Sequence, residues 1–193
     1  YMGQILTVDL SKHAFKQERL NPGLLKRFFG GRGLGIALLI EYFMHLEQKG
    51  LYTNAFREIA PFSADNMLIF STSPATGTGM PASGRIHANF KSPLTDGVGG
   101  SNAGGFWAVA FKKTGHDVLR IRGKSATPIY LQIDSSGVEF LDATALLNLN
   151  VEAITDRLLK TAPKGARCMT IGAAGRNLSR IAAIMNDRGR AMG

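Results

Sequence analysis

The sequence predicts a fold that mixes α-helices with short β-strands and repeats one structural unit in two halves. Short alternating or apolar runs bounded by glycine and proline indicate strands, and a few longer segments carry apolar residues at helical spacing. A unit of strand, glycine loop and Arg-Ile-x-Ala strand occurs twice, from Leu68 to Asn89 and from Cys168 to Ile184. The repeat is short, and chance is the alternative explanation.

The first fifty residues predict a β-hairpin followed by two helices. Gln4–Leu10 and His13–Arg19 indicate strands joined by a short turn. Asn21-Pro22 is typical of a helix start, because asparagine caps free backbone N–H groups and proline leaves none unpaired. This helix is expected to run to Phe29. Leu34–Gln48 has apolar side chains at helical spacing, which indicates a helix packed against the core.

The rest of the chain predicts further strands around two more helices. Residues 50–65 indicate a long irregular stretch, and helices are expected at Gly104–Thr114 and Val151–Thr161. Asp134–Gly137 is typical of a hairpin turn. The expected strands are Asn66–Ser71, Arg85–Phe90, Asp117–Ile121, Ile129–Ile133, Val138–Leu141 and Arg167–Ile171.

A glycine-rich stretch from Gly79 to Trp107 is the strongest candidate for a binding site. Glycine lets main-chain N–H and C=O groups approach a ligand closely, and Arg85 supplies a planar, permanently charged group. The stretch therefore predicts a cradle for a large anionic ligand, with an ordinary glycine-rich connection between strands as the alternative. Asn102 lies within the glycine cluster, which comprises Gly97, Gly99, Gly100, Gly104 and Gly105.

Composition limits the class of protein. A chain of 193 residues with 45% apolar content can bury a substantial core, as one domain or as two fused halves. No apolar run approaches the roughly 18 residues of a membrane span and the N-terminus lacks an export signal, so we expect no membrane association. Cys168 is the only cysteine, which excludes an internal disulfide and favours a reducing cytoplasm.

The net charge of +9 indicates anionic partners. Nucleic acid is disfavoured, because the basic residues do not form a stripe with interleaved aromatic side chains. They instead recur beside glycines, which suggests several loops converging on phosphate; solvated loop charges are the alternative. The glycine-flanked positions are Gly31-Arg32-Gly33, Gly84-Arg85, Gly123-Lys124, Gly175-Arg176 and Gly189-Arg190.

A series of short motifs runs along nearly the whole chain. The first motifs are GGRGLG at 30–35, Ala82–Arg85, Lys91–Thr95 and Asn102–Gly105. The later motifs are Lys113–Asp117, Arg122–Lys124, Ile171–Leu178, Ala183–Asp187 and Arg190–Gly193. No single motif is decisive, but their order and gaps resemble the N-terminal domain of the tungsten-containing aldehyde:ferredoxin oxidoreductases.

This resemblance implies an α+β domain of two pseudo-symmetric β-rich halves with packed helices. It also implies a tungsten bis-pterin cofactor of the molybdopterin type, with a Mg²⁺ ion that bridges the two pterin phosphates. The implied cofactor-binding residues are Arg85, Asn102, Gly104, Arg190, Ala191 and Gly193. The implied magnesium ligands are the main-chain carbonyl groups of Asn102 and Ala191.

The resemblance further implies an enzyme that oxidises aldehydes to carboxylic acids and passes the electrons to ferredoxin. Family proteins are much longer than this chain, and a 4Fe-4S cluster takes about four cysteine thiolates, which Cys168 alone does not supply. We therefore expect residues 1–193 to form a single cofactor-binding N-terminal domain of a longer protein, inactive alone, with the cluster in the C-terminal part. A stand-alone module that binds a nucleotide or polyanion is the alternative. The aldehyde, the choice of tungsten or molybdenum, and assembly into a homo-oligomer stay open.

Overall fold

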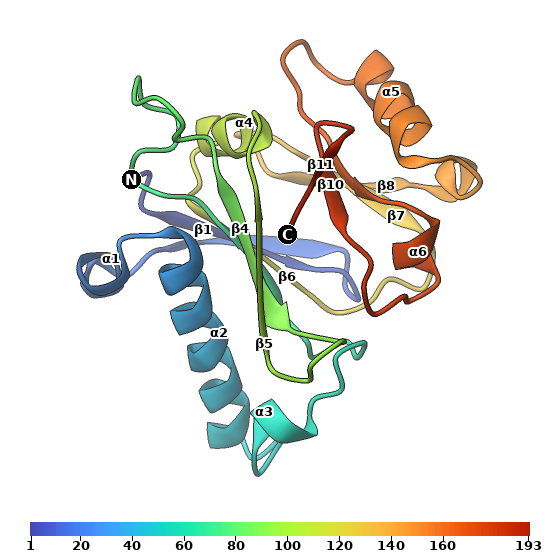
Figure 1. The fold of residues 1–193 in the computed structure, drawn as a ribbon. Coiled ribbons are helices and arrows are strands. Elements are labelled where there is room, and N and C mark those ends of the chain that lie inside the picture. The colour runs from blue at the N-terminus through green and yellow to red at the C-terminus, as the bar shows by residue number, and fades with distance from the viewer.

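A six-stranded mixed sheet forms the centre of the molecule, and two smaller sheets lie beside it (Figure 1). The computed structural model describes residues 1–193. Strands follow the order β2-β1-β6-β3-β4-β5 in the large sheet, β11-β10-β9 in the second and β7-β8 in the third. Helices pack on the sheets without alternating regularly with parallel strands, which confirms the α+β class.

The N-terminal hairpin and first helix agree with their sequence signals. Strands β1 (Gln4–Asp9) and β2 (Ala14–Arg19) pair antiparallel, and β1 also pairs parallel with β6 (Val118–Arg122). Helix α1 (Pro22–Phe28) has Asn21 as its cap, whose side chain accepts a hydrogen bond from the Gly23 N–H. The predicted cap chemistry is therefore confirmed.

The long helix α2 (Gly31–Gln48) begins three residues before the predicted start at Leu34. Its first N–H group donates to the Thr72 carbonyl at 2.9 Å, and the Ser71 hydroxyl donates to the Gly31 carbonyl at 2.7 Å. Contacts from a strand distant in sequence thus stabilise a glycine-rich first turn that local propensity disfavours. Within the stretch predicted as irregular, Ala55–Glu58 forms a short helix, α3, capped by Asn54.

Part of the glycine cluster is a β-strand and not a loop, because Gly99 and Gly100 lie within β5 (Val98–Ala103) while Gly97, Gly104 and Gly105 lie outside it. Strand β5 pairs antiparallel with β4 (Ile86–Lys91), which pairs antiparallel with β3 (Leu68–Ser71). A side chain at Gly99 would lie 2.5 Å from the Phe90 ring, so glycine permits the strand to pass over that ring. Tertiary packing explains this glycine better than ligand contact does.

The C-terminal third repeats a three-stranded antiparallel meander. Strands β9 (Met169–Ile171), β10 (Ile184–Asn186) and β11 (Arg190–Ala191) pair in sequence order, as β3, β4 and β5 do. The repeat predicted from sequence therefore has a structural counterpart, although its second strand begins at Ile184 and not at Arg180. The remaining elements of the chain are α4 (Trp107–Lys113), β7 (Ile129–Ile133), β8 (Val138–Asp142), η1 (Thr144–Leu146), α5 (Val151–Thr161) and α6 (Ala173–Arg176).

Two apolar clusters cover opposite faces of the large sheet. Neighbouring residues of β1 point to opposite faces, so Ile5 packs toward α2 while Leu6 packs toward α4 and the β7-β8 hairpin. Helix α2 covers β3 and β4 and leaves the face of β1 and β2 less covered (Figure 1). None of the helices is both long and apolar enough to cross a membrane.

Candidate functional site

The two repeated meanders meet where β5 lies beside the C-terminal residues. The Asn102 N–H donates to the Gly193 carbonyl at 2.8 Å, and the Gly193 N–H donates to the Asn102 carbonyl at 3.1 Å. The Asn102 side-chain amide also donates to the Gly193 carbonyl at 3.3 Å. This reciprocal pair joins the edge of the large sheet to the end of the small one, and in Figure 1 the C-terminus lies next to the β4-β5 hairpin.

Ala191 faces the same junction. In the β10-β11 ladder it is opposite Met185, and the following residue, Met192, donates its N–H to the Ile184 carbonyl at 2.9 Å. Antiparallel pairs alternate between hydrogen-bonded and non-hydrogen-bonded, so the Ala191 N–H and C=O point away from β10, on the side where Gly193 meets Asn102. The two carbonyl groups singled out as magnesium ligands thus belong to one junction.

Two adjacent side chains, at the end of β10 and the start of the β10-β11 turn, form hydrogen bonds to the loop between β5 and α4. The Asn186 side-chain amide donates to the Gly104 carbonyl at 2.7 Å, and the Asp187 carboxylate accepts from the Phe106 N–H at 2.7 Å. Asn186 is fully buried. We call these two contacts the cross-half latch. Sequence reasoning placed both residues in a motif but gave neither a role, because their partners lie more than eighty residues away.

Three arginines border β5 and make the junction cationic. The Arg85 guanidinium donates to the Asn102 side-chain carbonyl and is exposed to solvent. The exposed side chains of Arg32 and Arg190 lie against Gly100 and Gly105 of the same segment. Neither Arg32 nor Arg190 forms an ion pair within the chain, so the surface can accept an anion. Arg32 was noted only as a glycine-flanked arginine, and it is the residue that sequence reasoning missed here.

His87 lies beneath this surface, opposite Asn102 in the β4-β5 ladder. Burial lowers the pKa of His87, and the positive charges of Arg32 and Arg85 lower it further. Its ring lies close to Gly31 at the start of α2, and its Nδ1 atom is buried without a hydrogen-bond partner. A neutral imidazole adds no charge to the site near neutral pH.

We expect His87 to make folding stability depend on mildly acidic pH. Its pKa is lower in the folded chain, so the unfolded chain takes up the proton first as pH falls, and stability present above the unfolded pKa is progressively lost. In His87→Gln, the fall in the free energy of unfolding from pH 7 to pH 5 should be smaller, by at most about 1.4 kcal/mol per pH unit. Urea titrations at each pH measure it. His116 contributes a similar term in both proteins, and exposed His45→Gln is the control; an unchanged pH slope in His87→Gln would contradict the assignment.

The junction offers oxygen and guanidinium groups and lacks the usual ligands of a transition metal. The chain contains no cluster of three or more His, Cys, Asp or Glu side chains that could hold a metal ion. Main-chain carbonyl oxygens suit a hard cation such as Mg²⁺, whereas arginines suit phosphate. The arrangement is therefore chemically matched to a phosphate-bearing ligand together with a hard cation.

A family model and curated proteins match the chain over nearly its whole length. Residues 5–193 match the family model described as "Aldehyde ferredoxin oxidoreductase, N-terminal domain". The chain is 37% identical over its whole length to the tungsten-containing aldehyde ferredoxin oxidoreductase of Pyrococcus horikoshii and spans 30% of that protein. It is 34% identical to the aliphatic sulfonate oxidoreductase, WOR-like subunit, of Pyrococcus furiosus, of which it spans 31%.

A solved structure is similar across almost the entire chain. The active site complex BamBC of benzoyl coenzyme A reductase, with bound 1,5-dienoyl-CoA, superposes with a TM-score of 0.85 and 30% sequence identity. The match covers 99% of this chain and 28% of the other. The junction of the two meanders is thus part of an architecture found in proteins about three times longer.

Proposed function

The chain belongs to the aldehyde ferredoxin oxidoreductase N-terminal domain family, and from that membership we propose that it forms one domain that holds a tungsten bis-pterin cofactor. The protein that contains it would oxidise aldehydes to carboxylic acids and pass the electrons to ferredoxin in the cytoplasm. The curated relatives named tungsten-containing aldehyde ferredoxin oxidoreductases support this proposal. Since the chain spans about 30% of their length, the activity belongs to the larger protein.

The reciprocal hydrogen bonds between Asn102 and Gly193 are the observation that carries the proposal. They bring together two segments that a ligand with two phosphate-bearing halves would need side by side. Each carbonyl oxygen has two lone pairs, so the Asn102 carbonyl can accept from Gly193 and still bind a cation. The residues present therefore fit a bis-pterin bridged by Mg²⁺.

Each proposed ligand residue has a distinct task. Arg85 and Arg190 would bind pterin phosphates through their guanidinium groups, and Asn102 orients Arg85 by accepting its hydrogen bond. The Asn102 and Ala191 carbonyls would hold Mg²⁺, while Gly104 and Gly193 leave room for the ligand to approach the main chain. A side chain at Gly104 would meet no atom of the chain within 4 Å, so this side of the backbone is open there.

The tungsten centre would supply the two-electron redox chemistry when bound, and this chain would supply binding and electrostatics. Its arginines lower the cost of bringing a dianionic ligand into the protein. The single cysteine, Cys168, is buried, and an iron–sulfur cluster would need further cysteines, which we place in the larger protein. We place substrate selection in the larger protein, a proposal supported by relatives that carry a similar domain and are named for sulfonate and benzoyl-CoA chemistry.

Metal and pterin analysis tests the proposal. The protein is purified anaerobically as the cell makes it, tungsten and magnesium are measured by mass spectrometry, and released pterin is measured by fluorescence after oxidation. We expect one tungsten and two pterins per chain, together with aldehyde-dependent reduction of ferredoxin. Protein that is folded and lacks both tungsten and pterin would contradict the assignment and favour a polyanion-binding module.

A further inference from the structure

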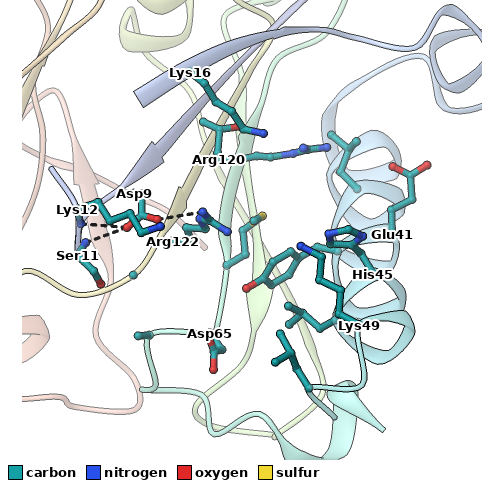
Figure 2. A pocket seen from close by; sticks show the side chains of 18 of the residues that line it. Asp9, Ser11, Lys12, Lys16, Glu41, His45, Lys49, Asp65, Arg120 and Arg122 are labelled. Carbon is teal, nitrogen blue, oxygen red and sulfur yellow. Dashed lines mark hydrogen bonds and ion pairs between the residues drawn. The ribbon is translucent and has the colours of Figure 1, made fainter. Parts of the chain in front are cut away.

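A cavity lies on the α2 face of the large sheet, apart from the junction of the meanders. It has a volume of about 650 Å³, which is within the range of small-molecule sites. Strands β1, β2 and β6 form its floor and the side of α2 forms its wall (Figure 2). We call it the α2 groove, and it contains none of the proposed cofactor-binding residues.

The groove begins where the apolar core ends. On this face, Ile5 and Val118 are paired and belong to the core under α2. Two residues further along each strand the pair is Thr7 and Arg120, and the next is Asp9 and Arg122. A sheet face under a helix is normally apolar, so this change to polar and charged side chains at the floor of a cavity requires a separate explanation.

The two floor arginines carry donors that the chain does not satisfy. The Nε atoms of Arg120 and Arg122 are buried and have no hydrogen-bond partner. Arg122 is paired through Nη2 with Asp9 at 3.0 Å, whereas Arg120 forms no ion pair. Burial lowers the pKa of Arg120, and the nearby carboxylates of Glu18 and Glu41 offset only part of that effect. Because these Nε atoms are closed to solvent, a ligand in the groove would meet the terminal guanidinium N–H groups, and those of Arg120 have no ion-pair partner. Oxygen atoms of a ligand would satisfy them.

Most carboxylates of the groove are already engaged. Asp9 accepts from the N–H groups of Ser11 and Lys12 in addition to Arg122, and Glu18 pairs with Lys16 and Thr7. Asp65 accepts from the Tyr52 hydroxyl. Five Lys or Arg residues line the groove against four Asp or Glu residues, and Lys12, Lys49 and Arg120 have no ion-pair partner. Among the charged lining residues without a hydrogen-bond or ion-pair partner, cations therefore outnumber the one carboxylate, Glu41.

We propose that the α2 groove binds a small organic oxyanion, a carboxylate or a phosphate ester, whose oxygens accept hydrogen bonds from Arg120 and Arg122. Leu38, Tyr42 and Leu46 of α2 supply an apolar wall for the carbon skeleton of the ligand. Exposed Lys49 caps the C-terminal end of the same helix and lines the groove, and Figure 2 shows its side chain beside His45. The shared chemistry is an anionic oxygen group on a small, partly apolar molecule.

Calorimetric titration of the cofactor-loaded protein at low ionic strength tests this site. The probes are inorganic phosphate, glycerol phosphate and succinate, with neutral succinamide as the uncharged analogue. We expect at least one of the anions to bind and succinamide not to bind. Whether the phosphates or the carboxylate bind with the higher affinity identifies the class of the ligand. In the cofactor-loaded protein the arginines of the junction are occupied, so the heat of titration measures anion binding in the α2 groove.

Substitution locates the binding. Losing charge-assisted hydrogen bonds in Arg120→Gln should weaken binding about 10- to 100-fold. Arg19→Gln removes the same charge from an exposed position outside the groove and should leave the affinity unchanged. If Arg120→Gln unfolds at a lower temperature, Lys49→Gln at the exposed C-terminal end of α2 serves instead and should weaken binding several-fold. No binding of any anion at millimolar concentration, or equal affinity in these variants, would overturn the proposal.

Discussion

Arg85→Ala is expected to lower the tungsten and pterin content of the purified protein while the fold survives. Arg85 is exposed, and its guanidinium forms a single side-chain hydrogen bond, to Asn102, so its removal should change the free energy of unfolding by no more than about 0.5 kcal/mol. A hydrogen bond between a guanidinium and a phosphate is worth about 1.5–3 kcal/mol, which corresponds to about 10- to 100-fold in cofactor affinity. Tungsten is measured by mass spectrometry, and folding by thermal unfolding.

Two matched variants make this result specific. Arg19→Ala removes an exposed arginine from the far edge of the same sheet and should retain normal tungsten. Arg85→Lys keeps the charge and loses the planar fork, so its cofactor content should lie between the two. Normal tungsten content in Arg85→Ala would mean that this arginine does not bind the cofactor.

The elements predicted most accurately are those whose signals are local. The Asn21 cap, the turn at Asp134–Gly137 and the helix at Val151–Thr161 depend on residues within a few positions of one another. Asp134 accepts hydrogen bonds from Ser136 and Gly137 inside its own turn, which lowers its pKa. Such interactions are the same in any fold, and the sequence is therefore sufficient to predict them.

Where the sequence pattern and the structure differ, contacts between distant segments determine the secondary structure. The glycine cluster has the composition of a loop, yet pairing with β4 places Gly99 and Gly100 in strand β5. The first turn of α2 depends on hydrogen bonds between Gly31 and two residues at the end of β3, the Thr72 carbonyl and the Ser71 hydroxyl, which lie about forty positions along the chain. Periodicity does not encode such partners, and tertiary pairing overrides local propensity.

The same distinction between local signals and distant contacts applies to the candidate site. Its six residues were named from the family resemblance, whereas composition and spacing indicated only an anion-binding surface. The structure brings Arg85, Asn102 and Gly104 next to the C-terminal residues, but the pairing between Asn102 and Gly193 spans ninety-one positions and has no local signal. For the same reason no sequence pattern identifies the latch residues Asn186 and Asp187, whose partners are more than eighty positions away.

Gly105→Ala is expected to produce the largest loss of stability at the junction. Gly105 has φ of +115°, and a Cβ atom there would lie 2.6 Å from the Asp187 carboxylate and 2.9 Å from the Asn186 amide nitrogen. The strained backbone costs about 1–3 kcal/mol, and displacing the latch costs roughly 1–3 kcal/mol for each buried polar group left unpaired. We expect a loss of about 3 kcal/mol in the free energy of unfolding, measured by urea titration, together with low tungsten content.

Gly104→Ala separates stability from cofactor binding at the adjacent position. Gly104 has no positive φ, and an added Cβ would meet no atom of the chain within 4 Å, so the stability should change by no more than about 0.5 kcal/mol. If the pterin approaches the main chain on this open side, the methyl group occupies the space that the ligand needs, and tungsten content should fall even though the fold is intact. Equal loss of stability in both variants would contradict the latch geometry, whereas a stable Gly104→Ala protein with full tungsten content would place the cofactor elsewhere.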